Sequence, residues 1–209
     1  YARQNLLEHP ALVGEAYLEL YAATGDKKYR DAAIAIAETY ARLQLPDGTW
    51  DIKLWEKDGS PVLEGGGSAP VKITPTTICL FLENIAKVTG DNRWRDISDK
   101  AFSYIDAGPL KTYDFGPQFE DTKPSVNYRD LTSVVPMNLA IYLLKRFPDD
   151  PKRVAQAREL SRHQCRNVQF QNIIPDDFQI VKFSHGDIQN GLQTLIQFHG
   201  TDLLGPEAQ

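Results

Sequence analysis

The chain has 209 residues, of which 42% are hydrophobic and 24% are charged, and its formal net charge is −5. This composition is typical of a globular protein with a sizeable core, and the acidic balance argues against nucleic-acid binding, which usually needs a basic surface. No apolar run approaches the roughly 18 residues of a membrane span, so no membrane partner is expected. Cys79, Cys165 and the four histidines have no metal-ligand spacing, so we expect neither a metal nor a cofactor.

The chain begins with Tyr1 and has no signal-peptide pattern. We interpret it as a mature product, a shortened chain or a fragment. Its localisation stays open between the periplasm, secretion and the cytoplasm.

Two segments 65 residues apart share a Thr-Gly-Asp centre followed by an aromatic residue and Arg-Asp. They are residues 23–33 (ATGDKKYRDAA) and 88–98 (VTGDNRWRDIS). A glycine at this place can adopt the left-handed conformation that ends a helix, and the aspartate can cap the next helix. Each centre therefore predicts a tight turn between two antiparallel helices.

Apolar residues recur at helical spacing on both sides of the first centre. They are Leu12, Ala16, Leu20 and Ala23 before it, and Tyr29, Ala32, Ala33, Ile36, Tyr40 and Leu43 after it. This spacing predicts the first helical hairpin.

The second hairpin is predicted to begin with Thr74 as a cap and Pro75 at the first helical position. Its apolar positions are Ile78, Leu82 and Ile85 in the first helix and Trp94, Ile97, Ala101, Tyr104 and Ile105 in the second.

A third copy covers about residues 131–166, with apolar positions at Val135, Leu139, Tyr142 and Leu143. In its turn, FPDDPKR, Asp150 is the expected cap and Pro151 the expected first helical residue. A further helix, DIQNGLQTLIQF, is expected from about residue 184. The short segments NVQF and FQIVKF predict small hairpin strands within a loop.

Three helix pairs with a period of about 60 to 65 residues predict an all-α repeat architecture of the (α/α)6-toroid type. We expect one domain over residues 1–209, with inner helices lining a cavity and outer helices around them. About three and a half hairpins are present, so the chain corresponds to part of a toroid. Either a homo-oligomer or a missing half would complete it.

The turns within the pairs are short, whereas the connections between pairs, residues 44–73, 107–130 and 164–185, are long. Antiparallel helices place all the long connections at one end of the scaffold. Long loops on a rigid scaffold usually carry the functional residues. We therefore expect the site at this end.

The connections combine aromatic residues with carboxylates, as carbohydrate sites do. The expected substrate-binding residues are Trp50, Asp51, Trp55, Tyr128, Arg129 and His185. Glu120 and Asp121 are the expected catalytic pair, because adjacent carboxylates can raise one another's pKa and keep one acid protonated.

Each of these assignments has a structural alternative. Glu120 or Asp121 is equally well a cap or a salt-bridge partner of Arg129. Trp50 and Trp55 are equally well hydrophobic plugs over the helix ends. His185 is a base only if Asp187 orients it, and Asp187 fits better as a helix N-cap.

Three segments resemble the six-hairpin α/α-toroid carbohydrate-active proteins of bacteria, which include unsaturated uronyl hydrolases, related uronidases and sugar 2-epimerases. Residues 17–50 are similar to the family's hairpin that ends in Q-x-PDG-x-W. Residues 116–133 (GPQFEDTKPSVNYRDLTS) resemble its QFED segment, and ARELSRHQC (157–165) resembles the outer helix that follows. The resemblance implies carbohydrate processing, with Glu120 and Asp121 in the site. The catalytic aspartates of the uronyl hydrolases and the histidine pair of the epimerases match no motif of this chain.

The leading hypothesis is a glycoside hydrolase that acts on oligosaccharide or polysaccharide substrates containing uronate or of plant type. Arg129 and Lys123 would bind a substrate carboxylate in this enzyme. A polysaccharide lyase using Tyr128, His185 and Arg129 is an alternative on the same fold. A non-catalytic glycan-binding or scaffold module is the alternative of a different class.

Overall fold

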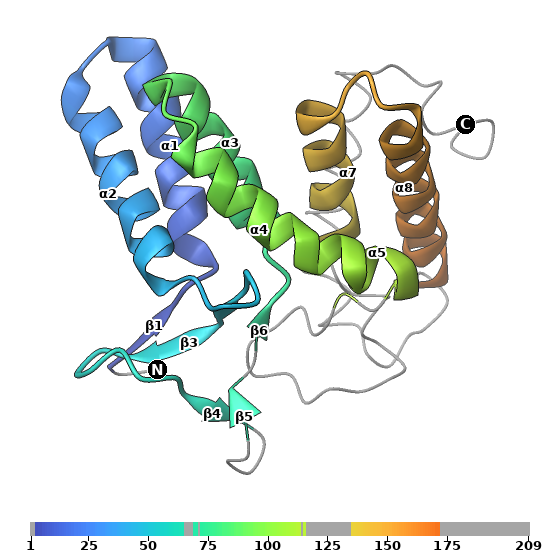
Figure 1. Ribbon diagram of the computed structural model, residues 1–209, viewed down its shortest axis with the longest axis horizontal. Coiled ribbons are helices and arrows are strands. Elements are labelled where there is room, and N and C mark those ends of the chain that lie inside the picture. The colour runs from blue at the N-terminus through green and yellow to red at the C-terminus, as the bar shows by residue number, and fades with distance from the viewer. Residues whose placement is uncertain (1–2, 65–68, 71, 114, 116–134, 172–209) are drawn as a thin grey trace. The chain divides into compact units, whose positions relative to one another are not determined.

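The structure is a computed structural model that describes residues 3–64, 69–70, 72–113, 115 and 135–171. It divides into two compact parts, Tyr1–Thr112 and Tyr113–Gln209, and each is described by itself. The described residues are mostly helical (Figure 1), which confirms the all-α prediction. The toroid and the single domain over 1–209 stay predictions.

The N-terminal part contains helices and short strands. The helices are α1 (His9–Thr24), α2 (Lys27–Leu43), α3 (Thr76–Thr89), α4 (Arg93–Ala107) and α5 (Pro109–Thr112). The strands are β1 (Gln4–Leu6), β2 (Trp50–Asp51), β3 (Lys53–Trp55), β4 (Leu63–Glu64), β5 (Ala69–Pro70) and β6 (Lys72–Ile73). They pair antiparallel as β1 with β3, β2 with β6, and β4 with β5. In the C-terminal part, α7 (Val135–Arg146) and α8 (Pro151–Gln171) pack as a pair.

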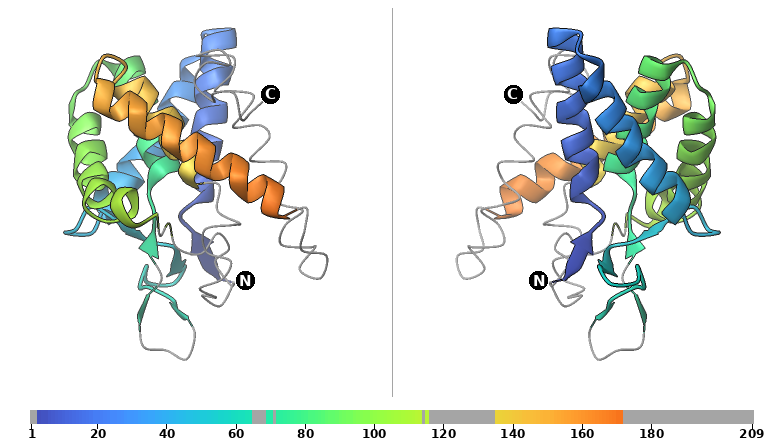
Figure 2. Two further views of the ribbon diagram at one scale, coloured as in Figure 1. Left: turned by 90° about the vertical axis from the view of Figure 1, so that its right-hand side faces the viewer. Right: turned by 90° about the vertical axis from the view of Figure 1, so that its left-hand side faces the viewer.

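The helices pack as the predicted hairpins, α1 with α2, α3 with α4, and α7 with α8. In the N-terminal part the two short turns lie at one end of the helices and the paired strands lie at the other (Figure 1). Figure 2 shows the same separation from two further directions. The first connection therefore lies at the end opposite the turns, as the repeat predicted.

The Thr-Gly-Asp turns have the same hydrogen bonds in both copies. Gly25 and Gly90 are left-handed, with φ of 70° and 71°. The Thr24 hydroxyl donates to the carbonyl of Leu20 at 2.6 Å and accepts from the Asp26 N–H at 3.2 Å, and Thr89 repeats both bonds. The Asp26 carboxylate then accepts from the N–H of Lys28, as Asp91 does from the N–H of Arg93. The predicted helix stop is confirmed in both copies, and the predicted cap is confirmed at Asp26. In the second copy Asn92, not Asp91, is the cap residue of α4.

The third turn also follows its prediction. The Asp150 carboxylate accepts from the N–H of Lys152 at 2.9 Å, and α8 begins at Pro151, as predicted.

The second hairpin begins one residue later than predicted. Pro75 is the cap of α3 and Thr76 is its first residue, because the Pro75 carbonyl accepts the first helical bond, from the N–H of Cys79 at 2.9 Å.

The strand predictions were wrong where they can be compared. NVQF, residues 167–170, belongs to α8, so the third connection begins later than expected. FQIVKF lies outside the described residues. The described strands lie in the first connection and before α1, where none was expected.

The core of the N-terminal part centres on three aromatic side chains. Tyr40 packs edge-on against Trp50 and Phe81, and its ring centroid lies 5.9 Å from that of Trp50 and 6.2 Å from that of Phe81. All three side chains are almost fully buried.

The α1 helix packs into this core with a different face from the predicted one. Its buried residues are Ala11, Gly14 and Leu18, whereas Leu12, Ala16, Leu20 and Ala23 are exposed.

Candidate functional site

The turn after α2 holds the first connection against α4. The side-chain amide of Gln44 donates to the carbonyls of Gly48 and Ile97, at 3.1 and 3.0 Å. The ammonium group of Lys100 donates to the carbonyl of Leu45 at 3.1 Å. Gly48 has φ of 89°, and a Cβ atom there would lie 2.4 Å from the carbonyl oxygen of Lys100. The Pro-Asp-Gly segment of the family resemblance is thus a tight structural turn in this chain.

Three predicted binding residues lie in the described part of the first connection. Trp50 is fully buried, and its indole N–H donates to the carbonyl of Tyr40 at 2.8 Å. Trp50 therefore fills the core as a hydrophobic plug, which is the structural alternative to the predicted sugar-binding role. Trp55 is half-buried on β3, opposite Gln4 of β1. Asp51 on β2 is 7% exposed and lies opposite Lys72 of β6.

A second buried charge lies two residues after Asp51. Lys53 is 4% exposed and belongs to β3, whereas Asp51 belongs to β2, and the two strands pair with different partners. Burying a charge costs free energy unless neighbouring groups compensate it. We therefore regard Asp51 and Lys53 as structural groups of the connection, and Trp55 as the predicted sugar-stacking residue that keeps exposed surface here.

The remaining predicted site residues lie outside the described residues. They are Glu120, Asp121, Lys123, Tyr128, Arg129 and His185. Their assignments stay predictions.

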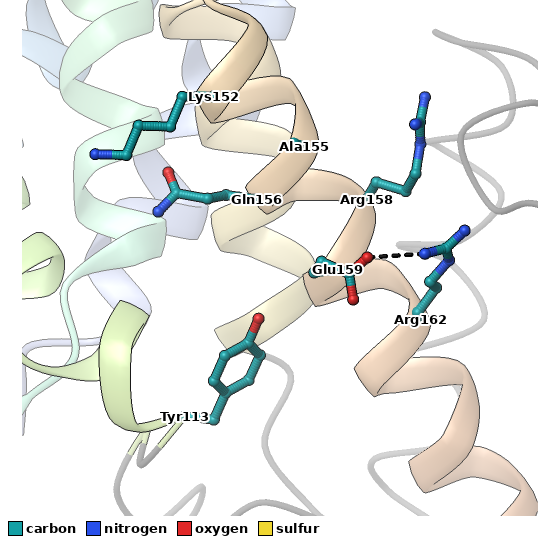
Figure 3. A pocket seen from close by; sticks show the side chains of 7 residues that line it. All are labelled: Tyr113, Lys152, Ala155, Gln156, Arg158, Glu159 and Arg162. Atoms are coloured by element: carbon teal, nitrogen blue, oxygen red, sulfur yellow. Dashed lines mark hydrogen bonds and ion pairs between the residues drawn. The ribbon is translucent and has the colours of Figure 1, made fainter.

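The C-terminal part contains an open pocket of about 350 Å³ along α8. Its lining residues, drawn in Figure 3, are Tyr113, Lys152, Ala155, Gln156, Arg158, Glu159 and Arg162. Three side chains are cationic and one is a carboxylate, so the pocket has an excess of positive charge. A volume of this size falls within the usual range of small-ligand sites.

One ion pair organises the carboxylate side of the pocket. A guanidinium nitrogen of Arg162 lies 2.8 Å from a carboxylate oxygen of Glu159, one helical turn earlier (Figure 3). Their side chains are 32% and 53% exposed, so the pair lies in contact with water and contributes little to stability. Its main effect is to orient the Glu159 carboxylate and the Arg162 guanidinium beside the pocket.

Tyr113 faces α8 from the segment after α5, with its hydroxyl directed toward the side of Glu159 (Figure 3). Its φ is 56°, an uncommon value for a residue with a large side chain. The ring of His163 lies 5.1 Å from the Tyr113 ring and 6.5 Å from the buried ring of Phe115. This aromatic cluster holds the Tyr113 ring in place.

Burial and the charge of Glu159 raise the pKa of the Tyr113 phenol. The phenol therefore stays protonated at neutral pH and can donate a hydrogen bond into the pocket. Together with the Gln156 amide and the cations, it gives the pocket donors suited to an anionic, hydroxyl-rich ligand.

The α8 residues were not among the predicted site residues, because charged residues at helical spacing are typical of a solvated helix face. The spacing of these residues could nevertheless have indicated that they lie together. The pocket residues on one side of α8 are separated by three or four positions along the helix: Lys152, Gln156, Glu159 and Arg162.

Within the described residues, no group of three or more His, Cys, Asp or Glu side chains could hold a metal ion. No described helix is long and apolar enough to cross a membrane.

No protein-family model, curated protein or solved structure matches this chain.

Proposed function

We propose that this chain is a carbohydrate-active enzyme, a glycoside hydrolase that binds uronate-containing saccharide fragments. The observation that carries the proposal is the α8 pocket, in which three cations, a phenol and an amide line one open space. Guanidinium groups pair well with carboxylates through charge-assisted hydrogen bonds. Phenol and amide donors suit sugar hydroxyls.

The binding roles follow from the lining of the pocket. Arg158 or Lys152 would pair with the uronate carboxylate, because neither is part of the Glu159–Arg162 ion pair and their side chains extend to opposite sides of α8 (Figure 3). Tyr113 and Gln156 would donate to sugar hydroxyls. In this proposal the Glu159 carboxylate accepts a hydrogen bond from a sugar hydroxyl while Arg162 holds it in place.

The cleavage roles rest on the sequence. Asp121 or Glu120 would protonate the leaving glycosidic oxygen, and the other carboxylate would activate water or stabilise the developing cation. The α/α-toroid arrangement belongs to the same proposal. It is supported by the helical hairpins and by the first connection lying at the end opposite the turns.

A polysaccharide lyase is the second candidate, because a phenol and several cations line one pocket, as proton abstraction beside a uronate carboxylate requires. The raised pKa of Tyr113 argues against it, since a base must lose its proton at working pH. We therefore place the hydrolase first.

The decisive experiment follows the ultraviolet absorbance of uronate oligosaccharides during incubation with the protein. A lyase creates an absorbing carbon–carbon double bond, so absorbance rises. Hydrolysis of an unsaturated uronyl substrate removes it, so absorbance falls. Reducing-end analysis detects hydrolysis of saturated substrates. Binding without turnover would instead support the glycan-binding module.

The catalytic assignment is tested with Asp121→Asn and Glu120→Gln. Loss of general acid–base catalysis typically lowers turnover by about 10²–10⁴-fold, with KM almost unchanged. Arg158→Gln and Lys152→Gln should raise KM for uronates but not for neutral oligosaccharides. If both carboxylate variants turn over at the wild-type rate, the catalytic assignment is wrong.

A further inference from the structure

The α7–α8 pair is basic, although the chain as a whole is acidic. Residues 135–171 contain seven Lys or Arg residues and three Asp or Glu residues, whereas the formal net charge of the chain is −5. Positive charge is therefore concentrated in the hairpin that carries the α8 pocket. Such asymmetry within one chain indicates that this part binds an anionic ligand.

Two of the three pocket cations have no partner in the part of the chain that the structure describes. The Nε atom of Arg158 is buried and has no hydrogen-bond acceptor there. The Lys152 ammonium group also forms no ion pair or hydrogen bond with a described residue. Arg162 differs, because its guanidinium is paired with Glu159. The pocket thus offers two uncompensated positive charges, and an acceptor on a ligand would satisfy the buried Nε atom.

The two unpaired cations are too far apart to bind one carboxylate together. They are six positions apart on α8, which corresponds to about 9 Å along the helix axis. Their side chains extend to opposite sides of the helix (Figure 3). Ala155 lies between them and also lines the pocket, and its small side chain leaves room for a ligand to cross α8. A ligand that pairs with both cations must therefore carry two anionic groups.

We propose that the α8 pocket binds an oligosaccharide that contains two uronate residues, with one carboxylate at Lys152 and the other at Arg158. This inference rests on the proposed function and narrows its substrate from a saccharide with a single uronate to an oligouronate. Sugar hydroxyls between the two carboxylates accept from Tyr113 and Gln156 and donate to Glu159. The Glu159 carboxylate disfavours a phosphate chain, which has no hydroxyl group to donate to it.

Isothermal titration calorimetry with galacturonate, tetragalacturonate and neutral cellotetraose tests the proposal. Tetragalacturonate should bind about tenfold more tightly than galacturonate at low ionic strength, because two ion pairs form on one ligand. Cellotetraose should bind more weakly than either uronate. The measurement detects binding without turnover, so it does not depend on the catalytic assignment.

Substitutions of the two cations test where the carboxylates bind. Arg158→Gln and Lys152→Gln should each weaken tetragalacturonate binding about three- to tenfold. The two factors should multiply in the double variant, because the cations share no partner. Galacturonate reaches one cation at a time, so at most one of the two substitutions should lower its affinity to this extent.

Lys145→Gln is the matched control. It removes the same charge from an exposed position of α7 outside the pocket, and it should leave all three affinities unchanged. Melting temperatures of the variants report whether each is folded.

The outcomes separate this inference from the proposed function. Equal affinities for galacturonate and tetragalacturonate, or a loss in only one of the two cation variants, overturn the inference but leave uronate binding intact. Cellotetraose that binds as tightly as the uronates, or uronates that do not bind, overturn the proposed function and the inference together. Tripolyphosphate that binds more tightly than tetragalacturonate would show that the pocket recognises phosphate chains, and it overturns the inference.

Discussion

The hydroxyl group of Tyr40 on α2 accepts a hydrogen bond of 2.9 Å from the backbone N–H of Ala11 in the first turn of α1. The same hydroxyl donates to the carbonyl of Leu7, just before the helix begins. Backbone N–H groups in the first turn of a helix lack partners within the helix. Tyr40 thus acts as a cap supplied by the other helix of the hairpin, 29 residues further along the chain.

Replacing this hydroxyl should destabilise the protein. Tyr40→Phe leaves a buried N–H and a buried carbonyl without their shared partner, and we expect a loss of about 2–4 kcal/mol in the free energy of unfolding. Urea denaturation measures the change. Tyr29→Phe, at a half-buried position of the same helix, is the control and should change stability by much less. Equal losses in the two variants would show that the Tyr40 bonds have no special role.

The same phenol predicts a pH dependence. Burial raises the pKa of Tyr40 above its ordinary value of 10.0, with a smaller contribution from the charge of Glu8. The unfolded chain therefore releases this proton at a lower pH than the folded chain. The stabilisation is complete below about pH 10 and is lost as the pH rises further. The stability difference between wild type and Tyr40→Phe should thus be constant up to about pH 9 and shrink as the pH rises above about 10. A difference that stays constant above pH 10 would contradict this.

Gly48 and Gly59 provide a matched pair of substitutions, because both have positive φ, of 89° and 69°. Nothing lies within 4 Å of a Cβ atom at Gly59, whereas at Gly48 it would overlap the Lys100 carbonyl. Gly59→Ala should therefore cost about 1 kcal/mol for backbone strain alone. Gly48→Ala should cost about 2–4 kcal/mol, because α4 or the turn must also shift. Thermal and urea denaturation of both variants test the difference.

The Tyr113 phenol reports on its neighbour in the α8 pocket. Burial is the larger cause of its raised pKa, and the charge of Glu159 is the second. Glu159→Gln should therefore move the pKa of Tyr113 part of the way back toward its ordinary value of 10.0. NMR titration of tyrosine ring carbons, with Tyr113→Phe to assign the signal, measures the shift. An unchanged pKa would mean that the carboxylate does not face the phenol.

The turns could be predicted from the sequence because their hydrogen bonds are local. Thr24, Gly25 and Asp26 make theirs within four residues along the chain, and so do their counterparts in the second copy. The buried face of α1 could not be predicted in this way. Apolar residues occur on all sides of this helix, so periodicity does not distinguish the Ala11–Gly14–Leu18 face from the exposed face that includes Leu12 and Leu20.

The short strands also escaped prediction, for a different reason. Each has two or three residues and is stabilised by a distant partner, as β1 is by β3 about 50 residues later. The role of Trp50 depends on a carbonyl group of Tyr40 in the preceding helix, which sequence patterns do not reveal. The α8 pocket depends on Tyr113 meeting residues about 40 to 50 positions further along the chain.

The Thr-Gly-Asp turn determines its own conformation from a few consecutive residues, and this has a consequence for how such chains grow. A second copy of a segment that contains one turn and its two flanking helices should therefore form a hairpin from its own local hydrogen bonds, whatever its position in the chain. Inter-hairpin contacts, such as that of Phe81 with Gly14, are then the part that must diverge. The turns of the first two hairpins are therefore alike in sequence, whereas their helix faces differ with the neighbours that each hairpin packs against.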